Sequence, residues 1–276
     1  TESPPAATRT AGSPFPPPLD VSPPLRRVTR RAGSGHNDLV TSGKPPGLAP
    51  RGRNRNMRGI LVGLGGRARS WLQVCQRSDQ AELVGYVELS PENRARAIDE
   101  WDIPADAVFE SLEAAAAAVD ADFALDITPP AAHESVATEA FAAGLHLIGE
   151  KPLSDTFEAA KRMLAASEEA GLTHVITQNY RFGAVPRTAH RLLKERVVGE
   201  IKHVAVGFYR PWAHAPGTHY VTMPFPLITD MGIHHFDLLR YVLDLEPVSV
   251  YAETWNPSWG WHAGDAGHCA IFEFEG

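Results

Sequence analysis

The feature that most constrains the fold is a glycine-rich turn made of Gly63, Leu64, Gly65, Gly66, Arg67 and Ala68. It directly follows a short apolar run at residues 60–62. Gly63 permits a tight turn, Gly65 lets a pyrophosphate approach the backbone, and Ala68 is small enough for the next helix to pack on the strand. The start of that helix offers unpaired N–H groups to phosphate. The pattern therefore predicts a Rossmann-type α/β domain that binds a dinucleotide.

An acidic residue after the second apolar run indicates which dinucleotide is bound. Glu88 follows residues 83–87 and lies 20 positions after Ala68. In Rossmann domains a carboxylate at this distance bonds the adenosine ribose hydroxyls. The same charge disfavours the extra phosphate of NADP, and Leu89 beside it supplies no cation. We therefore predict NAD rather than NADP; the alternative is a plain strand–helix turn without a ligand.

Charge and cysteine content limit the partners and the location. Residues 1–56 hold nine Lys/Arg against three Asp/Glu, which leaves 17 against 30, a formal charge of −13, for residues 57–276. A nucleic-acid groove needs a basic surface, and no apolar run approaches the ~20 residues of a membrane span. The two cysteines, Cys75 and Cys269, fit a reducing compartment. We expect neither nucleic-acid nor membrane partners, and a cytoplasmic location.

The chain divides into three segments. Residues 1–56 carry 11 of the 23 prolines and are predicted to be disordered. Met57 precedes the first strand, so we expect it to be the native start and the segment before it to be read-through or a cloning artefact. Residues 57–178 alternate short apolar runs with amphipathic helices, which predicts the parallel sheet of a Rossmann domain. Residues 179–276 are the third segment.

The C-terminal segment has a different pattern. Long alternating strands are predicted at residues 201–210 and 248–255, with a helix at 234–243 between them. This is typical of an α+β domain built on an open, mostly antiparallel sheet. The chain stops at the end of an alternating run, residues 272–276, so we expect the domain to be incomplete and truncated at its C-terminus.

Particular residues predict where helices begin and end. Ser90, followed by Pro91, is expected to cap the second helix. Asp155 and Glu158 are expected to form a capping-box-like start to a later helix, which should end before Gly171.

The tripeptide Glu150-Lys151-Pro152 follows a strand predicted at residues 146–148. Carboxyl ends of strands in open α/β sheets face the ligand crevice, which places Lys151 near the nicotinamide. An ammonium group there can hydrogen-bond a substrate hydroxyl and favour its alkoxide form. The alternative is an ordinary surface lysine.

A second polar cluster is Asp230-Met231-Gly232-Ile233-His234-His235-Phe236-Asp237. Asp230, His234 and Asp237 fall at i, i+4 and i+7, so they can share one helical face. A histidine beside a carboxylate can act as a general base near neutral pH. The alternatives are that His235 and Asp237 are capping or packing residues, that the cluster binds a metal, or that it forms a structural salt bridge.

In this order the motifs resemble the glucose–fructose oxidoreductase/inositol dehydrogenase/MocA family. The resemblance runs from Met57 to the end of the chain. Besides the motifs above, it includes Asp126-Ile127-Thr128-Pro129-Pro130-Ala131-Ala132-His133, Ala143-Gly144-Leu145-His146 and Asn179-Tyr180-Arg181-Phe182. It implies a Rossmann domain followed by an α/β domain with an open antiparallel sheet, whose face mediates assembly into a homo-oligomer.

The resemblance also assigns roles to residues. It implies that Lys151 contacts the reacting hydroxyl, that His234 is the acid/base, and that Asp230 orients the substrate. The cofactor site then consists of the glycine turn and Glu88 together with Thr128, Pro129, His133, Glu150 and Lys151. The substrate site consists of Lys151, Tyr180, Arg181, Asp230, His234 and His235. No metal is expected.

The function that follows is an NAD-dependent dehydrogenase oxidising a secondary hydroxyl of a sugar, cyclic polyol or related carbohydrate. Two alternatives use the same fold. One is an NAD-dependent glycosidase that works by transient oxidation, and the other is a non-catalytic dinucleotide-binding regulator.

Overall fold

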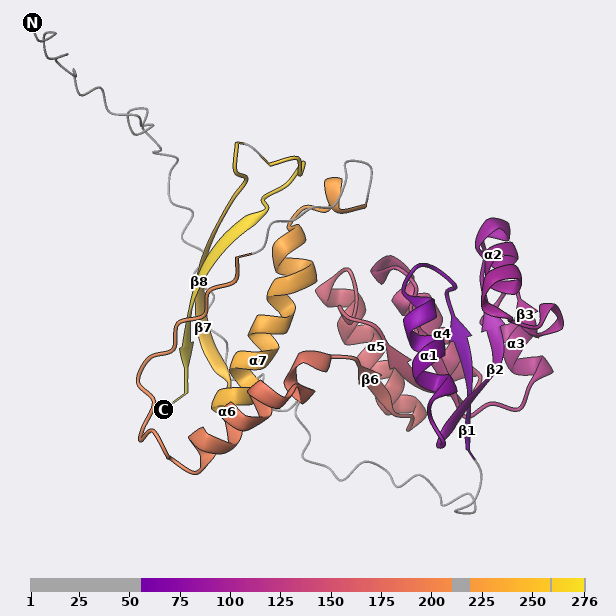
Figure 1. Cartoon of the computed structure of the whole chain (residues 1–276), viewed down its shortest axis with the longest axis horizontal. Coiled ribbons are helices and arrows are strands. Elements are labelled where there is room, and N and C mark those ends of the chain that lie inside the picture. Colours follow the sequence, from indigo (N-terminus) through magenta and orange to yellow (C-terminus); the bar gives the residue numbers. More distant parts are fainter. Residues whose placement is uncertain (1–55, 210–218, 259, 276) are drawn as a thin grey trace, which may run out of the picture.

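A computed structural model describes residues 56–209, 219–258 and 260–275. Apart from Asn56, the tail predicted to be disordered lies outside these residues. The described chain forms a Rossmann domain followed by a smaller α+β domain (Figure 1). The predicted fold class is therefore confirmed.

The Rossmann domain is a six-stranded sheet in which all neighbouring strands are parallel, in the order β3-β2-β1-β4-β5-β6. Because β1 has β2 on one side and β4 on the other, the strand order reverses at β1, and ligands bind beyond the carboxyl ends at such a point. The elements are β1 (Met57–Val62), α1 (Ala68–Gln76), β2 (Ala81–Val87), α2 (Pro91–Trp101), β3 (Val108–Phe109), α3 (Leu112–Ala118), β4 (Phe123–Asp126), α4 (His133–Ala142), β5 (His146–Gly149), α5 (Phe157–Ala170) and β6 (His174–Ile176).

Two hydrophobic cores cover the two faces of this sheet. Successive residues of a strand point to opposite faces. Ile60 and Val62 accordingly belong to one core, with side chains of α3, α4 and α5, while Leu61 belongs to the other, with side chains of α1 and α2. A sheet buried on both faces explains why its strands are continuous apolar runs.

Helix ends follow the predicted residues with one correction. Ser90 accepts the Asn93 N–H at the start of α2, and Gly171 ends α5 with φ 64°. The predicted capping role of Asp155 is wrong, because Thr156 is the last extended residue and its hydroxyl accepts the Ala159 N–H. Asp155 therefore lies one position before the cap.

The second domain packs helices against a β-hairpin. Figure 1 shows α7 between the hairpin and the Rossmann domain. Phe236 on α7 contacts Phe272 on the hairpin, with ring centroids 5.2 Å apart. The elements are a 3₁₀ turn (Asn179–Phe182), α6 (Ala184–Lys194), a 3₁₀ turn (His219–Val221), a π-helical turn (Leu227–Gly232), α7 (Ile233–Leu243) and the antiparallel pair β7 (Pro247–Trp255) and β8 (Gly267–Phe274).

The strand predicted at 201–210 is not formed over residues 201–209, and Arg210 lies outside the described residues. Val204, Val206 and Phe208 alternate as a strand would, but all three are exposed. In the part of the chain that the structure describes, β8 pairs only with β7, and residues 201–209 pair with neither. An alternating sequence gives a segment one apolar and one polar face. A β-strand also needs a neighbouring strand whose backbone N–H and C=O groups it can hydrogen-bond.

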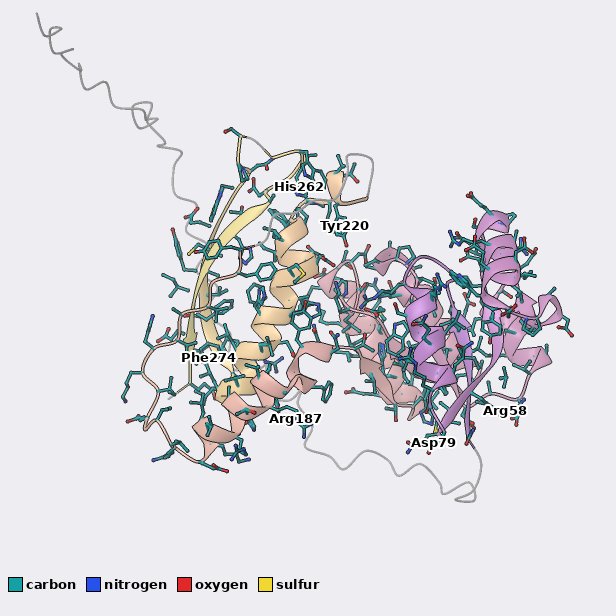
Figure 2. All side chains as sticks on the ribbon, viewed as in Figure 1. Arg58, Asp79, Arg187, Tyr220, His262 and Phe274 are labelled. Carbon is teal, nitrogen blue, oxygen red and sulfur yellow. The ribbon has the colours of Figure 1, made fainter. Side chains whose placement is uncertain are left out.

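The hairpin connection packs on the 3₁₀ turn that precedes α7. His262 lies 3.2 Å from the Tyr220 carbonyl oxygen through Nδ1, and its ring stacks on Trp261 at 3.9 Å. Figure 2 shows Tyr220 and His262 close together at one end of the second domain.

Three further features bear on the sequence predictions: the state of the cysteines, the presence of metal-binding clusters and the presence of membrane-spanning helices. Cys75 and Cys269 are free thiols. Among the described residues, no group of three or more His, Cys, Asp or Glu side chains is placed to hold a metal ion. No helix of the described chain is both long and apolar enough to cross a bilayer.

The Rossmann core yields a stability prediction. Leu125 on β4 is 1% exposed. Leu125→Ala should lower the free energy of unfolding by about 2–5 kcal/mol, because it removes buried methyl groups and leaves a cavity. Urea unfolding at an unchanged m-value measures this. Leu89→Ala is the control: Leu89 is 76% exposed, so its loss should change stability by less than about 0.5 kcal/mol. Equal losses would contradict the assignment of Leu125 to the core.

Candidate active site

The glycine turn joins β1 to α1 at the carboxyl edge of the sheet. Gly63 has φ +94°, and its N–H donates to the Val87 carbonyl at 2.8 Å. A Cβ at Gly63 would lie 3.2 Å from backbone atoms of Ile127, so both conformation and space require glycine. A Cβ at Gly65 or Gly66 would meet no atom within 4 Å. Packing within the protein does not explain these two glycines, whereas close approach of a pyrophosphate does.

The start of α1 is suited to bind phosphate. It has no side-chain cap and no acidic residue in its first turn. By contrast, side chains of Ser90, Ser111 and Thr156 cap α2, α3 and α5. The N–H groups and the positive dipole end of α1 are therefore left for an anion at the glycine turn.

Glu88 is fixed beside this turn. Its Oε2 accepts the Leu64 N–H at 2.7 Å, and its Oε1 accepts the Ser90 N–H at 2.8 Å. The Asn93 side chain also donates to Oε2, at 3.5 Å, whereas Oε1 keeps a further lone pair that can accept a bond from a ribose hydroxyl. Sequence reasoning missed Arg96, whose guanidinium donates to the Leu64 carbonyl at 3.0 Å and lies over the Trp101 ring.

The ends of β4 and β5 are tied to each other and to α1. Asp126, 1% exposed, accepts the Thr128 N–H at 2.9 Å and its hydroxyl at 2.6 Å, and its carbonyl accepts the Glu150 N–H at 2.9 Å. The Glu150 carboxylate accepts from Trp71 Nε1 at 2.9 Å and Arg67 Nε at 3.3 Å. Glu150 therefore connects the glycine turn to the loop that carries the predicted catalytic lysine. Sequence reasoning assigned no role to Asp126 or Trp71.

Pro129 and His133 flank the 3₁₀ turn that follows β4. Pro129 is exposed and precedes the 3₁₀ turn Pro130–Ala132. His133 is 2% exposed, and both of its ring nitrogens face backbone carbonyls. Its ring nitrogens are thus engaged within the protein.

Lys151 and Asp230 form an ion pair between the two domains. Lys151 Nζ lies 2.5 Å from Asp230 Oδ1 and 3.1 Å from the Asp230 carbonyl oxygen. The side chains are 14% and 20% exposed, so Lys151 is not an ordinary surface lysine. Asp230 belongs to the π-helical turn before α7, a conformation frequent at functional sites.

His234 lies beside this pair on the first turn of α7. It is 5% exposed, and the Tyr180 ring stacks on it at 4.0 Å and 7°. Burial lowers the pKa of His234 below 6.5, and the Lys151 charge lowers it further, against the opposing effect of Asp230. The neutral ring, which is the form that accepts a proton, is therefore favoured.

The structure does not bring every predicted substrate residue to this site. Arg181 donates to both oxygens of Asp237 and lies over the Tyr241 ring, which makes a structural pair between the 3₁₀ turn Asn179–Phe182 and α7. The Asp237 carboxylate is therefore engaged by Arg181 and not by the Lys151 pair. His235 contacts Phe208, with ring centroids 4.7 Å apart, on the side of α7 that faces the hairpin.

Both parts of the described chain match known family models. Residues 57–178 match the oxidoreductase family with the NAD-binding Rossmann fold, and residues 187–276 match the GFO/IDH/MocA C-terminal domain.

Individual relatives are similar over most of this chain. A Sinorhizobium fredii protein designated y4oX is 29% identical over 229 residues, 78% of this chain and 61% of its own. D-apiose dehydrogenase of Paraburkholderia graminis is 26% identical over 189 residues, 68% of this chain and 50% of its own. The WlbA dehydrogenase from Bordetella pertussis, solved with NADH and UDP-GlcNAcA, superposes with a TM-score of 0.68 at 25% identity, covering 80% of this chain and 64% of that one. The chain thus spans about half to two thirds of the length of these relatives. It belongs to the Gfo/Idh/MocA family of NAD-binding oxidoreductases.

Proposed function

We propose that this protein is an NAD-dependent dehydrogenase that oxidises a secondary hydroxyl of a sugar, cyclic polyol or related carbohydrate. The observation that carries the proposal is the partly buried Lys151–Asp230 pair beside the neutral, buried His234. D-apiose dehydrogenase and the WlbA dehydrogenase complex with UDP-GlcNAcA support a carbohydrate substrate.

The residues around the glycine turn fit NAD. The N-terminus of α1 would hold the pyrophosphate, Glu88 the adenosine ribose, and the loops at Thr128 and Glu150 the nicotinamide end. When bound, NAD supplies the acceptor for the hydride that leaves the carbinol carbon.

The chain's own side chains handle the proton and the charge. His234 Nδ1 is sealed in the interior, so Nε2 takes the hydroxyl proton as the O–H bond breaks and the C=O bond forms. Lys151 Nζ donates a hydrogen bond to the same oxygen and stabilises its negative charge, an effect that is strong where water is excluded. Asp230 holds the ammonium group in place at 2.5 Å.

Glu88 carries a prediction on cofactor choice. Glu88→Gln keeps the shape but removes the charge, so the Kd for NAD should rise about tenfold, the size expected for loss of a charge-assisted hydrogen bond. The preference for NAD over NADP should narrow, because the repulsion of the 2′-phosphate is removed. Titration with both cofactors measures this. Glu92→Gln, an exposed acid in the first turn of α2, is the control. An unchanged preference in Glu88→Gln would contradict this role.

A substrate screen tests the proposed function. The protein is incubated with NAD and a panel of aldoses, cyclic polyols and glycosides, and NADH absorbance is followed. Net NADH formation on a free sugar or polyol is the expected result. Hydrolysis of a glycoside without net NADH would replace the proposal with the glycosidase alternative. Binding of NAD without turnover on the whole panel would replace it with a regulator.

Two further expectations stay predictions. They are assembly into a homo-oligomer and a cytoplasmic location. Sedimentation velocity tests the first of them directly.

A further inference from the structure

A buried histidine lies between the two loops that border the proposed reaction site. His133 is the first residue of α4 and is 2% exposed. Its Nε2 lies 2.9 Å from the Thr128 carbonyl oxygen, on the loop after β4. Its Nδ1 lies 3.0 Å from the Pro152 carbonyl oxygen and 3.3 Å from that of Leu153, on the loop after β5. One ring therefore spans the two loops.

Both contacts of the His133 ring are with carbonyl oxygens, which determines how the ring can hydrogen-bond. A carbonyl oxygen only accepts hydrogen bonds, so the ring completes both contacts only by donating from both nitrogens. A neutral ring would donate on one side and set a nitrogen lone pair against a carbonyl on the other. The ring therefore donates to at least one of the two loops and lies between both carbonyl oxygens.

The neighbouring histidine does not compete for these oxygens. Both ring nitrogens of His174 are buried without a partner. Burial, and next the neighbouring His133, lower the pKa of His174 to about 4. His174 is therefore neutral, and His133 is the ring that contacts these carbonyl oxygens.

Side chains, rather than backbone hydrogen bonds, attach the loop after β5 to the Rossmann core. Among the described residues, 151–154 make no backbone–backbone hydrogen bond, whereas Glu150 just before them bonds the Asp126 carbonyl at 2.9 Å. Beyond Glu150, two kinds of contact connect this loop to the Rossmann core: the Leu153 side chain packs against the core cluster, and His133 contacts the carbonyl oxygens of Pro152 and Leu153. The loop carries Lys151, which must reach Asp230 in the other domain.

We propose that His133 is a positioning residue that clamps the Thr128 loop to the Pro152 loop. The clamp fixes the position of the Lys151 ammonium relative to the nicotinamide end of the bound cofactor. This inference rests on the proposed dehydrogenase function. The two ring nitrogens have different roles in it. The Nε2 contact with Thr128 shapes the loop that would bind the cofactor, and the Nδ1 contact with Pro152 positions the Lys151 ammonium for the reaction.

Three substitutions separate the two sides. The amide nitrogen of asparagine falls near the position of Nδ1, and that of glutamine near Nε2. His133→Asn should therefore keep kcat within about twofold and raise the Kd for NAD about fivefold, by loss of one hydrogen bond. His133→Gln should keep the Kd for NAD and lower kcat at least about tenfold, because small displacements of a catalytic group cost large factors. His133→Leu should show both losses.

The measurements are NAD titration by tryptophan fluorescence, steady-state kinetics and the Tm of each variant. His146→Gln is the control: His146 is at the opposite end of β5, where its Nδ1 accepts the Thr173 N–H at 3.0 Å. A purely structural role predicts that Asn and Gln variants lose Tm together, with no split between Kd and kcat, and this result would overturn the proposal. The His133→Asn and His133→Gln variants distinguish a positioning role from a structural role even if His133→Leu does not fold.

Failure of the proposed dehydrogenase function can be distinguished from failure of the proposed His133 clamp. If the wild-type protein binds NAD but turns over no substrate, the dehydrogenase assignment fails, and the Kd for NAD still tests the clamp. The clamp predicts weaker binding in the Asn and Leu variants and wild-type binding in the Gln variant. Equal Kd values in all four proteins would overturn it.

Discussion

Lys151→Ala is expected to lower kcat at least ~100-fold while leaving the Kd for NAD nearly unchanged. Lys151 is a cation close to the proposed reacting oxygen, and its side chain is only 14% exposed. Alanine leaves water or nothing to stabilise the alkoxide, and it also leaves the Asp230 carboxylate without its partner at 2.5 Å. The glycine turn and Glu88, which would bind most of the cofactor, are not touched.

Steady-state kinetics on a substrate found in the screen, with NAD titration alongside, measure this effect. Lys202→Ala is the matched control, because Lys202 is 75% exposed and pairs with Glu200 on the surface. It should leave both constants within about twofold, as surface substitutions do. Near-native turnover of Lys151→Ala would remove Lys151 from the chemistry and the proposed mechanism with it.

His234→Ala is expected to cause a loss of similar size, at least ~100-fold in kcat, because it removes the group proposed to take the hydroxyl proton. The buried ring also packs against Tyr180 at 4.0 Å, so the Tm of the variant must be measured before the kinetics are interpreted. His234→Phe keeps an aromatic ring in this stack and should show the same loss of kcat. His203→Ala, an exposed histidine at residues 201–209, is the control. Turnover retained by the Phe variant would contradict the role of His234 as base.

The pH dependence gives a second test of His234. Burial, and next the Lys151 charge, lower its pKa below 6.5. The ring is neutral and active above that pKa, so kcat/KM should fall as the pH decreases, with a midpoint below 6.5. Tyr180→Ala uncovers the ring and weakens the largest cause of the shift, so the midpoint should move up toward 6.5. A midpoint that does not move would show that stacking by Tyr180 does not set the pKa.

Much of the Rossmann domain was predictable because local rules act on neighbouring residues. The order of an apolar run, Gly63-x-Gly65-x-x-Ala68 and a helix depends on backbone conformation and packing within about a dozen residues. The same holds for the Ser90 cap and for Gly171, whose φ of 64° ends α5. The Asp155 prediction failed by one residue, since a capping box depends on where the last extended residue falls and two candidates, Asp155 and Thr156, are adjacent.

The site was only partly predictable, because its members come from distant parts of the chain. Motifs pointed to Lys151, Asp230 and His234, but only the fold shows Lys151 bonded to Asp230 across 79 positions of sequence. Spacing also suggested that Asp237 shares one helical face with Asp230 and His234, whereas its carboxylate accepts from Arg181 in the 3₁₀ turn Asn179–Phe182. A helical spacing defines a face of one helix and not what packs against that face.

The sequence by itself determined the Rossmann domain, its phosphate-binding turn and the identity of the ionisable side chains available for chemistry, since these follow from local conformational preference and residue chemistry. Only the tertiary structure decided that residues 201–209 pair with neither β7 nor β8, that Glu150 receives the Trp71 and Arg67 side chains, and that His133 spans two loops. The physical reason is that hydrogen-bond partners, burial and pKa shifts depend on groups brought together by folding, and no local pattern specifies which groups those are.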